Sequence, residues 1–242
     1  MRITKTSAPW PAEVVEKGWS HGRLPIPATS EWNEFAKYWE DLPADEYVRE
    51  SHGTTRLRRI GHLLARGGEG AGVTMERAPH GAFYQSAEIN SVYGGQVRTF
   101  APITAETYEN LCFRAALEHD LALVRRLEGD HQTWLVTVHL IRIVATGDAA
   151  SAPAPEGRHS DGHDYVIMHL VNRERCSGGL SRVFRKGGDR PALEHTLLEP
   201  METVVIDDRT MEHEVTPIRP ADATSAVRDM MIIDFDRVQP GG

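Results

Sequence analysis

A series of short β-like runs in the second half of the chain is the feature that most constrains its fold. From Gln132 onward, apolar residues alternate with Thr137 and His139, and a period of two residues is typical of a β-strand. Turn-forming pairs such as Asp161-Gly162 and Gly178-Gly179 separate the runs. Several short strands at this spacing favour an all-β sandwich or barrel. The further strands are expected at residues 165–171, 180–185, 203–207, 214–218 and 230–235.

Two helices are expected ahead of these strands. The first should begin behind the N-cap residues Thr29 and Ser30, where apolar residues recur at helical spacing, and it should end near Pro43. The second should begin after Thr104 and end at Gly129. The chain is therefore expected to be mainly β, with flanking N-terminal helices. The apolar stripe expected on the second helix comprises Tyr108, Leu111, Cys112, Ala115 and Ala122.

The length of 242 residues is compatible with one large domain or two small ones. All-β domains commonly reach about 250 residues, so one domain is the simpler interpretation. A stretch rich in Ala and Pro, GDAASAPAPEGR at residues 147–158, is either a linker between domains or a lid over an active site. Because candidate metal ligands follow this stretch directly, we favour the lid and a single domain over residues 1–242.

The charge balance and the cysteine content argue against several classes of protein. Lys and Arg number 27 against 35 Asp and Glu, a net charge of −8, so nonspecific binding to nucleic acid is not expected. Two cysteines are too few for a disulfide framework, which favours a reducing cytoplasm. No apolar stretch is long enough to cross a membrane, and no signal-peptide core follows the N-terminus. A cytoplasmic protein without a nucleic-acid or membrane partner is expected.

A candidate metal site lies directly after the Ala/Pro-rich stretch. In an extended segment, residues two apart point to the same face, so His159 and Asp161 can converge on one ion. His-x-Asp alone is weak, because a polar strand end with an Asp-Gly turn has the same sequence. His213, in a later strand-like run, would complete two histidines and one carboxylate. This triad leaves open positions on non-haem Fe(II), although Zn²⁺ accepts the same ligands.

Arg228 opens the apolar run RDMMIIDF that follows His213. A guanidinium in such a run is costly to bury unless it meets an anion, and its planar fork suits a carboxylate. A bound dicarboxylate is one candidate for this anion. An ion pair with a nearby acid such as Asp229 or Asp234 is the alternative.

These motifs occur in an order that resembles the Fe(II)/2-oxoglutarate-dependent dioxygenases. The resemblance is strongest to the bacterial branch of free L-amino-acid hydroxylases that includes isoleucine 4-hydroxylase, and it covers residues 82–238 approximately. An ordered series of motifs is far more specific than His-x-Asp alone. The resembling stretches are SAEINSVYGGQVRTFAPIT (86–104), VHLIRI (138–143), PEGRHSDGHDYV (155–166), NRERCSGGLSRVF (172–184), LLEPMETVVIDDRTMEHEVTPI (197–218) and RDMMIIDF (228–235).

The resemblance implies a fold, a set of cofactors and a reaction. The implied fold is a double-stranded β-helix, a cupin-like jelly roll over residues 82–238, with a helical and variable part at residues 1–81 packed outside it. The implied metal is Fe(II), held by His159, Asp161 and His213. The implied co-substrates are O₂ and 2-oxoglutarate, with the distal carboxylate of the latter on Arg228 and with Arg219 as the rival. The implied reaction couples decarboxylation of 2-oxoglutarate to succinate with hydroxylation of a substrate C–H bond.

The substrate is expected to be a small molecule, namely a free or lightly modified L-amino acid. Its carboxylate needs a cation and its ammonium an anion, for which Arg98 and Glu156 are available. Each residue also has a structural interpretation. Arg98 would be a solvated charge on a strand, and Glu156 would be a loop residue that holds the lid closed. Gln85 and its neighbour Tyr84 are further candidates for the pocket wall. Buried histidines with only structural partners are expected at His139 and His169, of which the latter could also support the site.

Two other functions fit the same residues. A metal-dependent hydrolase or isomerase on a jelly roll would use Zn²⁺ or Mn²⁺ in the same triad to activate water. A noncatalytic binding barrel would use His159 and His213 only structurally. Arg228 distinguishes the dioxygenase from the hydrolase, because a hydrolase does not need a clamp for a dicarboxylate.

Overall fold

The computed structural model describes residues 10–25, 29–48, 54–67, 73–89, 94–147, 150–222 and 224–238. Residues 90–93 of the upstream motif and residues 148–149 of the Ala/Pro-rich stretch lie outside this part of the chain. The helices are α1 (Trp10–Lys17), α2 (Thr29–Ala36), the 3-10 helix η1 (Lys37–Trp39), α3 (Ala105–Glu109) and α4 (Leu111–Glu128). Among the described helices, none has the length and apolar character needed to span a membrane.

Strands make up most of the regular structure. The strands of the N-terminal half are β1 (Trp19–Arg23), β2 (Thr54–Gly67), β3 (Val73–Arg77), β4 (Phe83–Tyr84), β5 (Val97–Arg98) and β6 (Ala101–Pro102). The later strands are β7 (Thr133–Thr146), β8 (Tyr165–Glu174), β9 (Cys176–Gly178), β10 (Leu180–Arg185), β11 (Pro191–Thr196), β12 (Glu202–Asp207), β13 (Met211–Val215), β14 (Ile218–Pro220) and β15 (Ser225–Arg237).

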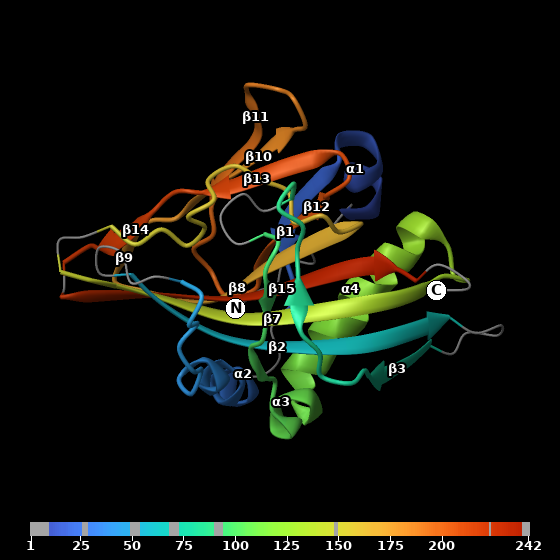
Figure 1. The fold of residues 1–242 in the computed structure, drawn as a ribbon, viewed down its shortest axis with the longest axis horizontal. Coiled ribbons are helices and arrows are strands. Elements are labelled where there is room, and N and C mark those ends of the chain that lie inside the picture. Colours follow the sequence, from blue (N-terminus) through green and yellow to red (C-terminus); the bar gives the residue numbers. More distant parts are fainter. Residues whose placement is uncertain are drawn as a thin grey trace.

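Two sheets form the framework of the molecule. The main sheet has the order β1-β12-β8-β15-β7-β2-β3, with β6 paired to β2, and the smaller sheet has the order β11-β10-β13. In Figure 1 the long strands β2, β7 and β15 cross the molecule, with α2 and α3 on one side, β10, β11 and β13 on the other, and α4 overlapping the strands in this view. The mainly β, jelly-roll fold predicted from the sequence is thus confirmed, with helices covering the outer face of the main sheet.

The main sheet is buried on both faces, and this explains the apolar character of its strands. On β7, Val136, Val138 and Leu140 belong to the core shared with the helices, whereas His139 and Ile141 line a pocket on the opposite face. On β8, Ile167 faces the helices, while Val166 and its same-face neighbours pack against the smaller sheet. The alternation seen in the sequence therefore separates a helix-facing side from a pocket-facing side.

The expected helices exist, but their details differ from the prediction. The first is α2 followed by the 3-10 helix η1, which ends at Trp39 rather than near Pro43. The second is broken at Asn110, whose side chain accepts hydrogen bonds from the backbone N–H groups of Cys112 and Phe113 and so starts a new helix. This restart changes the buried face, and the predicted stripe is wrong at three positions that are exposed. These positions are Leu111, Ala115 and Ala122, while the buried residues include Phe113, Ala116, Leu117, Leu121 and Val124.

Strands as well as helices come from the first 81 residues. Strand β2 pairs with β7 along residues 54–66 inside the main sheet, next to its edge strand β3, and β1 pairs with β12 at the opposite edge. The sequence of β2 did not suggest a buried strand because Arg56 and Arg58 occupy pocket-facing positions. The run expected at residues 214–218 is divided between β13 and β14, and the other strands lie close to their expected positions.

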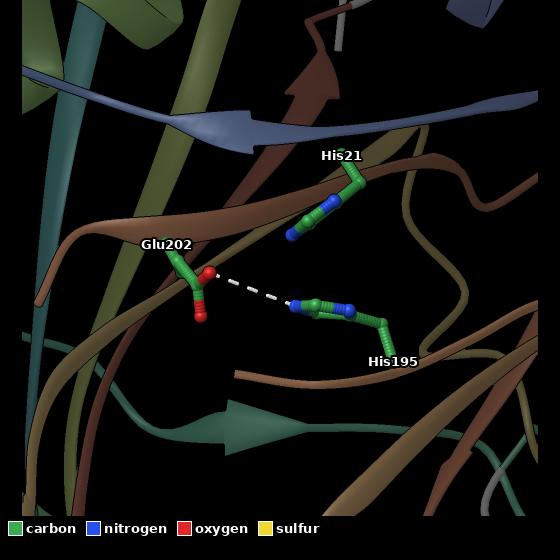
Figure 2. A group of neighbouring side chains, drawn as sticks. All are labelled: His21, His195 and Glu202. Atoms are coloured by element: carbon green, nitrogen blue, oxygen red, sulfur yellow. Dashed lines mark ion pairs between the residues drawn. The ribbon is translucent and has the colours of Figure 1, made fainter. Parts of the chain in front are cut away.

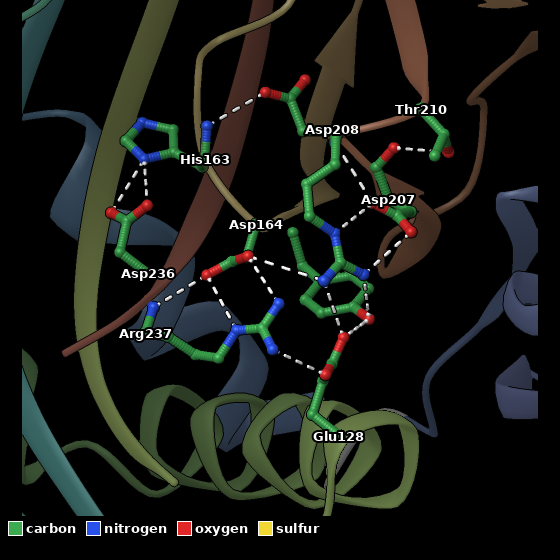
Figure 3. A network of polar contacts seen from close by, with 10 residues as sticks. Glu128, His163, Asp164, Asp207, Asp208, Thr210, Asp236 and Arg237 are labelled. Carbon is green, nitrogen blue, oxygen red and sulfur yellow. Dashed lines mark hydrogen bonds and ion pairs between the residues drawn. The ribbon is translucent and has the colours of Figure 1, made fainter. Parts of the chain in front are cut away.

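A network of charged side chains joins the end of α4 to the sheet (Figure 3). Arg237 pairs with both Glu128, at 3.0 Å, and Asp164, also at 3.0 Å. Arg209 pairs with Glu128 at 2.9 Å. Because Asp164 follows the His159–Asp161 segment by three residues, the network fixes one end of that segment to the helix.

Candidate active site

The structure brings His159, Asp161 and His213 together on one wall of the pocket between the sheets. Their ligand atoms all lie within 4.8 Å of one another. Nε2 of His159 is 3.6 Å from one carboxylate oxygen of Asp161, and Nε2 of His213 is 3.4 Å from the other. Two imidazoles and one carboxylate at this separation fit a divalent transition metal that retains open coordination positions. Residues far apart in the sequence thus come together as a group that could hold a metal ion, with the composition that the sequence analysis expected.

Backbone pairing positions the two histidines. His159 and His213 face each other in an antiparallel bridge with two N–H to carbonyl hydrogen bonds, of 3.0 and 2.8 Å. Their rings lie with centroids 4.5 Å apart. Nδ1 of His159 lies 2.7 Å from the carbonyl oxygen of Gly157, so Nδ1–H donates and Nε2 is the ring nitrogen available to a metal.

The turn that carries Asp161 is held by a carboxylate that the sequence analysis did not identify. Asp208 accepts hydrogen bonds from the backbone N–H groups of Asp161, Gly162 and His163, at 3.2, 2.7 and 3.0 Å. Gly162 has a φ of +87°, and a Cβ there would lie 2.5 Å from the side chain of Ile89, so the turn requires glycine. Asp208 lies in the turn between β12 and β13, and the sequence analysis assigned it no role in the site.

Replacing Asp208 by alanine should weaken iron binding without removing an iron ligand. Three backbone N–H groups would lose their acceptor, and loss of a residue that orients ligands typically costs about 10- to 100-fold in metal affinity. The free energy of unfolding should fall by about 1–3 kcal/mol. Anaerobic Fe(II) titration and thermal unfolding measure both effects. The matched control is Asp207→Ala, which removes the neighbouring acid that pairs with Arg209 instead, and equal iron affinities of the two variants would contradict this role of Asp208.

The protonation states of the triad follow from burial and from mutual charge. Burial raises the pKa of the Asp161 carboxyl, but the hydrogen bond with His159 and the charge of His213 outweigh it and hold that pKa well below its usual range. Burial lowers the pKa of His213 to about 4. Burial also lowers the pKa of His159, yet its interactions with Asp161 raise it to about 9. Asp161 is therefore an anion and His213 a neutral ligand at neutral pH, and a bound metal would displace the proton of His159.

Arg228 lines the same pocket and is 4% exposed. No ion pair or hydrogen bond joins its guanidinium to another described residue, and its buried Nε has no partner there. Asp229, the expected alternative partner, pairs with Arg142 at 2.7 Å instead. Burial, together with the charge of Arg173, lowers the pKa of Arg228 to about 10. A buried cation of this kind has an unmet requirement for an anion, and a carboxylate ligand in the pocket would meet it.

Arg219 does not occupy a comparable position. It lies on β14, is exposed, and is not among the residues that line the pocket. The geometry therefore favours Arg228 over Arg219 as the partner of a dicarboxylate.

The two candidate substrate residues both line the pocket. Arg98 is 2% exposed, so it is not a solvated strand charge, and it donates a 2.7 Å hydrogen bond to Oε1 of Gln85. The amide of Gln85 in turn donates to the carbonyl oxygen of Asp161 at 3.1 Å, which connects Arg98 to the metal-ligand segment. Tyr84, by contrast, is 59% exposed and faces away from the pocket.

The Ala/Pro-rich stretch forms part of the pocket wall through Pro153, Ala154 and Glu156. It is anchored at one end by hydrogen bonds between Ser151 and Ile218, at 2.9 and 2.8 Å, and at the other by the pairing of His159 with His213. This placement supports the prediction of a lid rather than that of a linker.

The sequence analysis missed a buried polar chain that crosses the floor of the pocket. Arg58 donates to Nδ1 of His139 at 2.6 Å, and Nε2 of His139 lies 2.7 Å from a carboxylate oxygen of Asp234. Because arginine is only a donor, His139 accepts at Nδ1 and donates at Nε2, so it is a neutral imidazole. Burial, aided by the charge of Arg58, lowers the pKa of His139 well below its usual value. The alternation of apolar and polar residues in the sequence can indicate that His139 points into the protein. Its partners, which lie on neighbouring strands, are visible only in the structure.

His169 does not support the pocket. Its ring bonds to Asp120 on α4 and to Thr203, both at 2.7 Å, on the helix-facing side of the main sheet. The even spacing from Asp161 does not carry over because a turn, not a strand, occupies residues 161–164. His169 is thus a buried histidine with structural partners, which was the simpler of the two expectations.

Comparison with known proteins identifies the family. Residues 36–234 match the family model described as 2OG-Fe dioxygenase, which is most of the chain. The chain belongs to the 2OG-Fe dioxygenase family. The predicted class of enzyme, a non-haem iron dioxygenase that depends on 2-oxoglutarate, and its Fe(II), 2-oxoglutarate and O₂ are confirmed at the level of this family. The match favours the dioxygenase over a metal-dependent hydrolase or isomerase and over a noncatalytic barrel.

Individual proteins of known sequence or structure are also similar to this chain. An L-isoleucine-4-hydroxylase from Bacillus thuringiensis is 26% identical over 155 residues, which are 63% of this chain and 64% of that relative. The crystal structure of a bsmA homolog from Methylobium petroleophilum PM1 has a TM-score of 0.78 at 26% identity and covers 93% of this chain and 91% of that one. The fold of IDO from Bacillus thuringiensis is also similar, with a TM-score of 0.76 at 18% identity, covering 95% of this chain and 94% of that one.

Proposed function

We propose that this dioxygenase hydroxylates a C–H bond of a small molecule, namely a free or lightly modified L-amino acid. In this proposal His159, Asp161 and His213 bind Fe(II), and Arg228 binds the distal carboxylate of 2-oxoglutarate. The observation that carries the proposal is a single pocket that contains the triad together with a buried arginine for which no anion is found among the described residues.

Each part of the pocket has a task in this reaction. Bound Fe(II), with 2-oxoglutarate and O₂, supplies the oxidising power, and 2-oxoglutarate leaves as succinate and CO₂. His159, Asp161 and His213 would hold the ion, and two histidines with one carboxylate would leave coordination positions for the co-substrates. Arg228 orients the co-substrate by a charge-assisted fork. The loop residues Pro153 and Ala154 cover the pocket and reduce the access of water.

The charges on the pocket wall support an amino-acid substrate. The guanidinium of Arg98 would bind the substrate carboxylate, and the carboxylate of Glu156 would bind the ammonium group. Arg58, which lines the same wall and is 8% exposed, adds a second cation near Arg98. The relative named L-isoleucine-4-hydroxylase is consistent with this substrate class.

We also propose that the protein acts in the cytoplasm. Cys112 and Cys176 are the two cysteines of the chain, and both are free thiols. Free thiols are the usual state in a reducing compartment.

The experiment that tests the function is succinate detection across a panel of free L-amino acids with Fe(II), 2-oxoglutarate and O₂. We expect one or a few amino acids to raise succinate formation well above the rate without substrate, with a product one oxygen atom heavier by mass spectrometry. The His159→Ala variant serves as the inactive control. Succinate formation that no amino acid stimulates would reject the substrate class, while absence of succinate and of a keto-acid charge-transfer band would reject the oxygenase itself.

A further inference from the structure

A second group of metal-binding residue types lies outside the candidate active site. It consists of His21 on β1, His195 on β11 and Glu202 at the start of β12 (Figure 2). Each residue offers one ligand atom, and these atoms all lie within 4.8 Å of one another. None of the three is among the residues that line the active-site pocket. The group is therefore a separate feature that the dioxygenase reaction does not use.

The atoms of this group are arranged around a common point. The two imidazole rings lie with centroids 4.1 Å apart, and Nε2 of His195 is 3.7 Å from Oε1 of Glu202. In Figure 2 both rings direct a nitrogen toward the side on which the carboxylate lies. Nε2 of His21 and Nε2 of His195 are buried, and neither has a hydrogen-bond partner among the described residues. Buried polar atoms without partners cost folding free energy, and a shared cation would satisfy both.

The carboxylate is held in place for such a role. The other oxygen of Glu202, Oε2, accepts hydrogen bonds from the backbone N–H groups of Leu198 and Glu199. These hydrogen bonds fix the orientation of the Glu202 side chain and leave Oε1 facing the imidazoles. Hydrogen bonds from neighbouring groups commonly orient a metal ligand in this way. In the β1–β12 pairing, His21 lies opposite Val204 and Arg23 lies opposite Glu202. Because residues two apart share a face, His21 and Glu202 project from the same side of the sheet.

A single shared proton does not satisfy both unpartnered imidazole nitrogens. A proton shared between His195 and Glu202 would account for only one of the two unpartnered nitrogens. It would leave Nε2 of His21 buried and unsatisfied, whereas a metal ion accounts for both.

We propose that His21, His195 and Glu202 bind a zinc ion at a site that is distinct from the candidate iron site. Two histidines, one glutamate and a water molecule make a complete tetrahedral set for Zn²⁺. Ligand atoms around tetrahedral zinc are roughly 3.3 Å apart for bonds of about 2.0–2.1 Å, so the 3.7 Å pair needs only a small closure.

The site would connect the edges of the two sheets. Strand β1 is the edge strand of the main sheet, and β11 is the edge strand of the smaller one. Strand β11 pairs with β10, and β10 pairs with β13, where His213 lies opposite Val183. A metal that holds β1 to β11 therefore stabilises the sheet that carries one candidate iron ligand, without contact with the reacting atoms.

The test is zinc binding by the double variant His159→Ala/His213→Ala, which lacks the candidate iron site. After equilibrium dialysis against Zn²⁺, metal analysis should give about one zinc per chain, and zinc should raise the melting temperature relative to chelator-treated protein. Adding His195→Ala or Glu202→Gln should abolish both effects. Glu202→Gln keeps a carbonyl oxygen to accept the backbone N–H groups, so it preserves the local structure. The matched control is His131→Ala, which removes an exposed histidine and should change neither effect.

If the double variant does not fold, zinc content and Co²⁺ absorption can be measured in chains that keep the candidate iron site. In the otherwise wild-type chain, Glu202→Gln should lower the bound zinc from about two ions to about one. Co²⁺ substituted for zinc should give the visible absorption of a tetrahedral site, which His195→Ala removes. Zinc contents that are the same with and without Glu202 and His195 would overturn the proposal, as would a folded double variant that binds no zinc.

Discussion

Replacing His159 by alanine is expected to abolish iron binding and turnover together. The substitution removes one of three ligands, and the remaining pair, Asp161 and His213, cannot hold Fe(II) against water. We expect the Fe(II) affinity to fall by at least about 100-fold, because removal of a ligand costs more than removal of a residue that only orients a ligand. Succinate formation should fall to background. Anaerobic Fe(II) titration followed by the succinate assay measures both quantities.

A matched control separates this effect from general damage to the fold. His131→Ala removes an exposed histidine outside the pocket and should leave iron affinity and turnover at wild-type levels. Circular dichroism should show that His159→Ala keeps its β-sheet, since the bridge to His213 is formed by backbone groups. Normal iron affinity in folded His159→Ala protein would contradict the assignment of the triad.

Replacing Arg228 by methionine is expected to retain iron but to weaken 2-oxoglutarate binding by about 100- to 10,000-fold. Two charge-assisted hydrogen bonds to a carboxylate, each worth about 1.5–3 kcal/mol, correspond to this loss. Methionine is similar in length and apolar, so it fills the space without a buried charge. The charge-transfer band of the iron and 2-oxoglutarate complex, titrated without O₂, measures the affinity.

The stability of the same variant provides a second, independent readout. Burial lowers the pKa of Arg228 to about 10, which means that its buried charge opposes folding when no anion is bound. The thermal stability of Arg228→Met without 2-oxoglutarate should therefore be equal to or above that of the wild type. Added 2-oxoglutarate should stabilise only the wild type. The control Arg219→Ala changes an exposed residue and should bind 2-oxoglutarate normally, and a reversed result would transfer the role to Arg219.

Local patterns were sufficient where a short segment decides the outcome. A strand needs only its own alternation, and the predicted run at residues 180–185 coincides with β10. His159 and Asp161 could be paired from their spacing, because side chains two residues apart in an extended segment point to the same face. Arg228 was suspected because a charge at the start of an apolar run needs a compensating anion. The order of these motifs then indicated the family that the comparisons support.

Local patterns failed where partners come from distant segments. The phase of α4 depended on the cap at Asn110, and a single helical stripe could not show this break. His169 was assigned two candidate environments, and the turn before β8 directs it to Asp120 on α4. The sequence analysis assigned no role to Arg58, whereas its position in β2 places it beside His139 in the wall of the pocket.

The amino-acid sequence by itself determined the strand-rich class of the fold and the family, and it supplied the residues of the proposed iron site, because these depend on periodicity and on ordered motifs. Only the tertiary structure decided which side chains meet. The pairing of His159 with His213, the support of Asp161 by Asp208 and the approach of His21 to His195 each join strands or turns far apart in the chain. Such contacts follow from strand register and sheet packing, and a shift of one residue in register would direct every side chain to the other face.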